Sequence, residues 1–167
     1  MLAGCTENMQ SFPKQNPPQT VVLRHRKENL KKCSLKGMEK RPDFQFFTYP
    51  LEELPPFSGY VLLTLDAPPL DRSDVDCGLF ILDGTWRYAE KMMRFVESHQ
   101  EFIFRSIPKG WKTAYPRKQN DCPSPEEGLA SIEAIFAAYH TLGRDTTGLL
   151  DHYYWKDQFL DINGICR

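Results

Sequence analysis

A single carboxylate follows one of the most apolar stretches of the chain. In the segment FILDGTW (residues 80–86), the apolar run ends at Asp83, and Gly84 and Thr85 lead directly to Trp86 and a helical pattern. Strand packing requires neither the aspartate nor the glycine. Parallel α/β sheets bind ligands outside the carboxyl ends of their strands, so Asp83 is a candidate functional group. A strand-to-helix turn capped by aspartate explains the same residues equally well.

Glu133 is the second candidate functional group. It stands among apolar residues that recur with helical spacing. A carboxylate on such an apolar helix face is costly unless it is paired. We therefore expect Glu133 either to contact a ligand or to pair with a basic residue of the segment 105–118.

Positive charge is concentrated in two segments, although the net charge of the 167 residues is only −1. Segment 24–41 holds eight Lys or Arg against two acidic residues, and segment 105–118 holds five against none. Charge separated in this way suits contact with a polyanion such as RNA. Two solvated basic faces would explain the charge alone equally well.

Cysteine spacing and apolar run length indicate where the protein works. The five cysteines are scattered, no two have C-x-x-C spacing, and no histidine stands near one at ligand spacing. A reducing compartment without a metal site is the simplest interpretation. Apolar runs such as those at 61–65 and 79–82 are far shorter than the ~18 residues that span a bilayer. We predict a cytoplasmic monomer that does not associate with membranes.

Four short apolar stretches predict a mainly parallel sheet. They lie at residues 20–25, 44–50, 60–65 and 78–82. Strands that are apolar on both faces are typical of α/β sheets covered by helices on each side. The fold class is therefore α/β.

Helical periodicity begins after the last of these strands. One stripe has three- and four-residue spacing and can be capped by Asp83 or Thr85; it comprises Trp86, Ala89, Met93 and Val96. A second helix ends at Gly143 and can begin after Ser124 or at Ser131; its stripe is Leu129, Ile132, Phe136 and Tyr139. A short third helix near the carboxyl terminus is expected to bury Tyr154, Phe159 and Leu160.

The chain divides into three parts. Residues 1–18 are polar and contain three prolines, which predicts a mobile tail. Residues 19–106 form an α/β sheet domain, and residues 107–167 form a mainly helical part. Hydrophobic residues make up 41% of the sequence, enough for a packed core.

Five collinear motifs resemble one family of RNA-modifying enzymes. They are KKCSLKGM (31–38), LDGTW (82–86), IPKGWKTAYP (107–116), GLASIEAIFAAYHTLG (128–143) and YWKDQFLDIN (154–163). Together they resemble the superfamily that joins DTW-domain proteins to the small-subunit ribosomal RNA aminocarboxypropyltransferases. These are SPOUT-type proteins, and the resemblance implies a deep trefoil knot in which the carboxyl-terminal part completes the cofactor site.

The resemblance implies a specific transfer. Such enzymes move the 3-amino-3-carboxypropyl group of S-adenosylmethionine to N3 of a uridine or pseudouridine, and methylthioadenosine leaves. It implies catalytic roles for Asp83 and Glu133. The cofactor-binding residues that it implies are Ser34, Leu63, Leu65, Asp83, Trp86, Ile107, Leu129, Ser131 and Ala134. Leu65 replaces a proline usual in the family.

The basic segments would hold RNA, most simply small-subunit ribosomal RNA during ribosome biogenesis. The expected contacts are Lys31, Lys32, Lys36, Lys112, Arg117 and Lys118. The spelling LDGTW is nearer to the transfer-RNA branch, and TAYP replaces the family's Ala-Asn-Pro. Three alternatives stay open: a transfer-RNA uridine aminocarboxypropyltransferase, a SPOUT methyltransferase, and a non-catalytic RNA-binding protein of ribosome assembly.

Overall fold

A computed structural model describes residues 16–116 and 128–166. Its strands are β1 (Thr20–His25), β2 (Phe44–Tyr49), β3 (Tyr60–Leu63), β4 (Gly78–Asp83) and β5 (Ile103–Arg105). Its α-helices are α1 (Trp86–His99), α2 (Ser131–Leu142) and α3 (Lys156–Ile162). Two 3-10 turns, η1 (Met38–Lys40) and η2 (Arg72–Asp74), complete the described elements. The four predicted strands are present, and only the three-residue β5 was not predicted.

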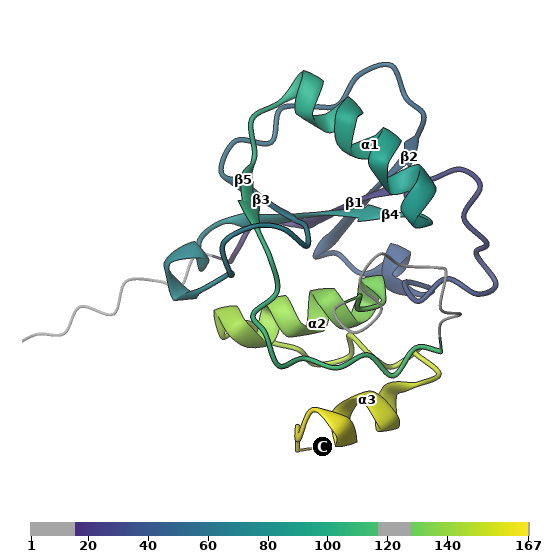
Figure 1. Cartoon of the computed structure of the whole chain (residues 1–167), viewed down its shortest axis with the longest axis vertical. Coiled ribbons are helices and arrows are strands. Elements are labelled where there is room, and N and C mark those ends of the chain that lie inside the picture. Colours follow the sequence, from purple (N-terminus) through teal and green to yellow (C-terminus); the bar gives the residue numbers. More distant parts are fainter. Residues whose placement is uncertain (1–15, 117–127, 167) are drawn as a thin grey trace, which may run out of the picture.

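All five strands are parallel, in the order β2-β1-β4-β3-β5. This confirms the predicted parallel α/β sheet. Strands β1 and β4 lie side by side at the centre, and their register places Arg24 beside Asp83 at the carboxyl edge. In Figure 1, α1 covers one face of the sheet, and α2 and α3 lie on the other.

Alternation along the strands divides the core between the two faces. Val21, Leu23 and Phe80 pack with α1 residues such as Met92. On the other face, Val22, Leu79 and Ile81 pack with the buried side of α2. This second cluster also contains residues of α3, so the predicted part 107–167 shares one core with the sheet. The division at residue 106 stays a prediction.

Helix α1 begins at Trp86, as predicted, but its capping differs from the prediction. Thr85 occupies the N-cap position without a side-chain hydrogen bond. The hydrogen bonds described for the Asp83 carboxylate go to side chains outside this helix. The buried residues of α1 are Met92 and Val96, whereas Trp86 is half-buried. Val96 is thus buried as predicted, whereas Met92 is buried in place of Met93.

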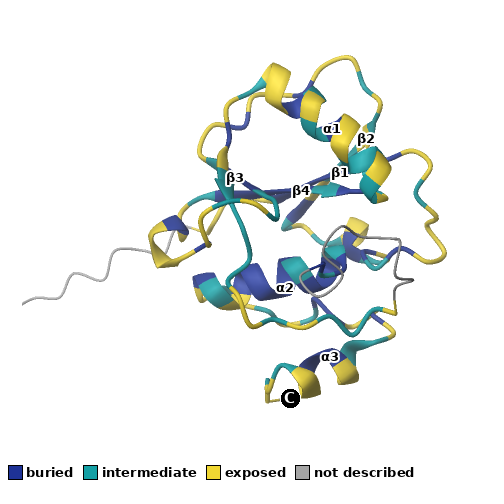
Figure 2. Ribbon diagram, viewed as in Figure 1, coloured by how far each residue is buried: buried dark blue, intermediate teal, exposed yellow. Residues whose placement is uncertain are grey.

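Helix α2 takes the later of the two predicted starts. It begins at Ser131, and the alternative start at Ser124 lies outside the described residues. Gly143 ends the helix in the left-handed conformation, with φ of 68°, which glycine adopts without steric cost. Figure 2 shows that α2 is buried along much of its length, which fits its apolar sequence.

The prediction for the third helix was partly wrong. Phe159 and Leu160 are buried in α3, as expected. Tyr154 is 83% exposed instead, because α3 begins after it, at Lys156, and the preceding turn points Tyr153 inward. Phe159 stacks on Trp111 with ring centroids 5.9 Å apart, which attaches α3 to the segment that follows β5.

Within the part of the chain that the structure describes, no helix is both long and apolar enough to cross a membrane.

We predict that Phe80→Ala lowers the free energy of unfolding by about 3–5 kcal/mol, the usual cost of truncating a buried phenylalanine. Phe80 is fully buried and contacts the rings of Phe57 and Phe102. Urea denaturation followed by circular dichroism measures this loss. The control Tyr154→Ala removes an exposed ring and should change stability by less than about 0.5 kcal/mol. Equal losses in both variants would contradict the described packing.

Candidate functional site

Asp83 lies at the centre of a buried polar cluster at the carboxyl edge of the sheet. Asp83 is only 4% exposed. One carboxylate oxygen, Oδ2, accepts hydrogen bonds from Arg24 Nε at 3.0 Å and from the Cys33 thiol at 3.5 Å. The other, Oδ1, accepts a hydrogen bond from the Ser131 hydroxyl at 2.9 Å. Groups from β1, β4, the loop after β1 and α2 therefore meet at one carboxylate.

Arg24 is the cation that makes this burial possible. The parallel register sets it beside Asp83 on the same face of the sheet. Its guanidinium lies 4.7 Å from the ring centroid of Phe46 and donates to Glu39 at 2.8 Å. Burial lowers the pKa of Arg24, but the hydrogen bonds and charges of Glu39, Cys33 and Asp83 outweigh burial and leave the pKa raised. Arg24 is a permanent positive charge at the site.

Cys33 and Glu28 complete the surroundings of Asp83. The ligand atoms of these three residues lie within 4.8 Å of one another. Burial, and then the charge of Asp83, raises the pKa of the Cys33 thiol to about 12. Burial also raises the pKa of Glu28, again reinforced by Asp83. The raised pKa and the hydrogen bond to Asp83 both favour a protonated Cys33 thiol. Metals bind the thiolate instead, so this environment favours a hydrogen-bond donor over a metal ligand.

The two predicted serines meet at the start of α2, where Ser131 is the first residue and Ser34 approaches from the loop after β1. The Ser131 hydroxyl donates to Asp83, and the Ser34 hydroxyl oxygen accepts from the Ile132 backbone N–H at 3.2 Å. The first N–H groups of a helix have no carbonyl partner within it. The loop after β1 supplies such a partner to Ile132 through Ser34. The predicted grouping of Ser34, Asp83 and Ser131 is what the structure brings together.

Glu133 has a different environment. Fully buried, its carboxylate accepts from the backbone N–H groups of Ala114 and Ala130, each at 2.8 Å. It also accepts from the hydroxyls of Thr113 at 2.6 Å and Tyr153 at 2.9 Å. Among the described residues of 105–118, neutral donors and no basic side chain pair with Glu133. Arg117 and Lys118 lie outside the described residues, so pairing with either of them stays a prediction. A catalytic role stays a prediction, but these contacts favour a role in positioning segment 113–115.

The apolar residues expected around the cofactor come from β3, from the segments that follow β3 and β5, and from the start of α2. Leu63 and Ile107 are half-buried and pack against the core cluster that contains α2. Leu65 follows β3, and Leu129 and Ala134 lie before and within the first turn of α2; all three are half-buried. Their predicted roles in cofactor binding stay predictions.

The basic residues of segments 24–41 and 105–118 are not all free at the surface. Lys31, Lys32, Lys36 and Lys112 are exposed, in agreement with a binding surface, whereas Arg117 and Lys118 lie outside the described residues. Arg24 and Arg105, however, form ion pairs with the buried carboxylates of Asp83 and Asp74, each at 3.0 Å. These two arginines stabilise the fold and do not add free charge to a surface.

Sequence reasoning missed Arg24 and Cys33 as members of the site. The available signal was the position of Arg24 within an otherwise apolar central strand, where a charge needs a partner. The cysteine carried no comparable signal, because only the path of the loop after β1 brings it to Asp83.

The fold matches that of a solved S-adenosylmethionine-dependent RNA-modifying enzyme. The matching structure is the SAM-dependent rRNA:acp-transferase Tsr3 from Vulcanisaeta distributa, with a TM-score of 0.66. The alignment covers 88% of this chain and 79% of that chain, at 20% sequence identity. This likeness establishes an α/β fold with a parallel sheet and flanking helices, while the knot that the motif resemblance implied stays a prediction. Neither a protein-family model nor a curated protein matches this sequence.

We predict that Glu133→Gln lowers the free energy of unfolding by about 1–3 kcal/mol. The amide keeps one acceptor oxygen, so at least one backbone N–H, of Ala114 or Ala130, is left facing an N–H₂ group, at the cost of an unsatisfied buried donor. Chemical denaturation measures the loss. Tyr153→Phe, which removes a single donor, is the control and should cost less. A Glu133→Gln protein of parental stability that lacks activity would instead establish a catalytic role.

Proposed function

We propose that this protein transfers the 3-amino-3-carboxypropyl group of S-adenosylmethionine to N3 of a uridine or pseudouridine in RNA. The observation that carries the proposal is the buried Asp83 cluster at the carboxyl edge of a sheet whose fold matches a SAM-dependent rRNA:acp-transferase. Open α/β sheets bind their ligands at this edge. The five motifs of the sequence support the same interpretation.

The donor set at Asp83 fits the amino acid end of S-adenosylmethionine. A carboxylate has about four acceptor positions, and three are used in the structure, so Asp83 Oδ1 keeps one for an ammonium. Arg24 has five N–H donors, of which three are used in its contacts with Asp83, Glu39 and Cys33. The remaining N–H groups of Arg24 suit a carboxylate. Opposite charges thus lie side by side, as an α-amino acid requires.

Each of the site's polar residues then has a defined role. Arg24 and Asp83 bind the two charged groups of the amino acid end, and Ser34 and Ser131 hold the start of α2 against them. When bound, S-adenosylmethionine supplies a sulfonium that activates its attached carbons. Held at its amino acid end by Arg24 and Asp83, S-adenosylmethionine would supply its activated side-chain carbon to N3 of the base. Methylthioadenosine would leave as the carbon–sulfur bond breaks, and the N3 proton would pass to solvent or to Asp83. Trp86 forms a wall of the pocket, where its ring attracts the positive sulfur.

Small-subunit ribosomal RNA is the proposed substrate, because the structure that shares this fold is a ribosomal RNA enzyme and the KKCS loop contributes Ser34 to the site. A transfer-RNA uridine stays the alternative that LDGTW favours. We further propose that the protein works in the cytoplasm as a monomer. A deep trefoil knot also stays a prediction. A chain path in an experimental structure that opens when both ends are pulled would contradict it.

The products of the reaction test the proposal against its rivals. Incubation with S-adenosylmethionine and ribosomal or transfer RNA should release methylthioadenosine, which chromatography with mass spectrometry identifies. Release of adenosylhomocysteine would indicate a methyltransferase instead. RNA binding without cofactor binding would indicate a ribosome-assembly protein. Mass spectrometry of ribosomal and transfer RNA from a deletion strain then identifies the modified nucleotide.

We predict that Asp83→Asn weakens S-adenosylmethionine binding about 10–100-fold and slows transfer with it, because a charged hydrogen bond to the ammonium is lost. Calorimetry and methylthioadenosine release on the same preparation measure both effects. Ser131→Ala keeps the charge and is the control. Unchanged affinity with a rate reduced ~10²–10⁴-fold would assign Asp83 to proton removal. A variant unchanged in both would leave Asp83 a purely structural role.

We predict that Trp86→Ala weakens cofactor binding by about 2–4 kcal/mol, as expected when a large contacting side chain is truncated. Trp86 is half-buried at the start of α1. Calorimetric titration with S-adenosylmethionine measures the effect, with Arg87→Ala, a change at the exposed neighbouring position, as the control. Parental affinity in a folded Trp86→Ala protein would remove Trp86 from the pocket.

A further inference from the structure

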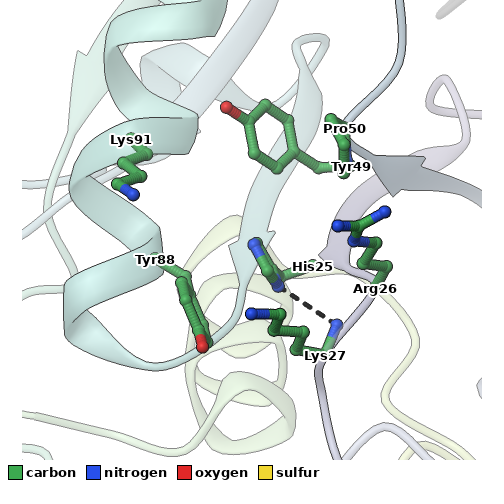
Figure 3. A pocket seen from close by; sticks show the side chains of 7 residues that line it. All are labelled: His25, Arg26, Lys27, Tyr49, Pro50, Tyr88 and Lys91. Carbon is green, nitrogen blue, oxygen red and sulfur yellow. Dashed lines mark hydrogen bonds between the residues drawn. The ribbon is translucent and has the colours of Figure 1, made fainter.

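A second concave site opens at the carboxyl edge of the sheet, on the face that α1 covers. It is a pocket of about 240 Å³ between the residues that end β1 and β2 and the first turns of α1. Its lining, shown in Figure 3, consists of His25, Arg26, Lys27, Tyr49, Pro50, Tyr88 and Lys91. None of these residues is acidic. Arg26 and Lys27 belong to the basic segment 24–41 that was expected to hold RNA, although none of the seven lining residues was named there as a contact.

His25 forms the floor of this pocket as a neutral hydrogen-bond donor. Its ring stacks on Tyr88 with centroids 3.9 Å apart and an interplanar angle of 6°. Its Nδ1 accepts a hydrogen bond from the Lys27 backbone N–H at 3.1 Å, which leaves the proton on Nε2. Burial lowers the pKa of His25, and the charges of Lys27, Arg26 and Lys91 lower it further. Near neutral pH the ring therefore offers one N–H group.

The three cations of the pocket are available to a ligand. Among the described residues, the ion pairs involve other side chains and none includes Arg26, Lys27 or Lys91. The Lys27 ammonium lies 5.9 Å from the ring centroid of Tyr88, and a backbone hydrogen bond from Arg26 to Tyr49 joins the ends of β1 and β2. Positive charges from two elements therefore face one small volume, which is the chemistry of an anion site.

The pocket is adjacent to Asp83 but on the other face of the sheet. Gly84 follows Asp83, and a Cβ added to it would lie 3.3 Å from the Cβ of His25. Because side chains alternate along a strand, Arg24 points with Asp83 toward α2 while His25 points toward α1. A ligand that reaches both sites must cross the carboxyl edge, as an extended nucleic acid strand does.

We propose that this pocket binds a backbone phosphate of the RNA substrate, on a nucleotide next to the one presented to Asp83. The inference rests on the proposed function, which places the target base at Asp83. A phosphate is favoured over a base, because the rings of Tyr49 and Tyr88 already pack on His25. Cations and one N–H group remain, and these suit phosphate oxygens. The phosphate fixes the register of the strand while the other site receives the base.

Salt dependence of RNA binding tests the pocket. The variant is Lys27→Gln with Lys91→Gln, and the matched control is Arg87→Gln with Arg94→Gln, which removes two exposed charges of α1 outside the pocket. A fluorescent single-stranded oligoribonucleotide is titrated at several salt concentrations. We expect the slope of log K against log salt to fall by about 0.7 for the pocket variant, because the protein then neutralises one phosphate fewer, and to stay parental for the control. Equal slopes in both would overturn the proposal.

Two further measurements separate this proposal from the proposed function and from other ligands. The pocket variant should raise KM for RNA several-fold while kcat and S-adenosylmethionine affinity stay parental, because the pocket lies off the Asp83 face. If the unmodified protein releases no methylthioadenosine, the proposed function is contradicted. The salt-dependence measurement still tests phosphate binding by the pocket, because it does not require catalysis. Uridine monophosphate, inorganic phosphate and a poly-glutamate peptide are titrated in parallel. Micromolar binding of any of them with an unchanged oligonucleotide slope would overturn the proposal.

Discussion

The buried ion pair between Arg24 and Asp83 is the interaction on which the candidate site depends. Removing two charges from water costs several kcal/mol each unless geometry and further hydrogen bonds compensate. Compensation comes from Glu39 and Phe46 on the arginine side, and from Cys33 and Ser131 on the aspartate side. The central strands, the loop after β1 and the start of α2 are therefore held together by the groups that could bind a ligand.

The protein stabilises the buried carboxylates of Asp83 and Glu133 in different ways, and the difference separates their roles. Asp83 faces a cation and keeps an acceptor position at the edge of the sheet. Glu133 is surrounded by four neutral donors, two of them from segment 113–115. Such a carboxylate has its hydrogen-bonding capacity largely used within the protein. It fixes the segment that follows β5 against α2, beside the core that α3 completes.

Part of this site could be predicted from the sequence. Asp83, Ser34 and Ser131 were expected together and lie together, because motifs that follow strands and begin helices converge at one edge of a parallel sheet. The partner of Glu133 could not be predicted, since backbone N–H groups carry no sequence signal. Which of Tyr153 and Tyr154 is buried depends on where α3 begins. Three consecutive aromatic residues, 153–155, precede that start, and the sequence pattern does not show which of them turns inward.

The sequence by itself determined the α/β class, four of the five strands, the end of α2 at Gly143 and the candidate carboxylates. These features depend only on residues near one another in the sequence: the spacing of apolar residues and the conformational freedom of glycine. The tertiary structure decided which charges are free. Segment 24–41 has a basic composition throughout, yet Arg24 is bound to Asp83 while Arg26 and Lys27 face a pocket. Alternating side chains of one strand enter opposite faces, and only the packing of α1 and α2 gives each face its partners.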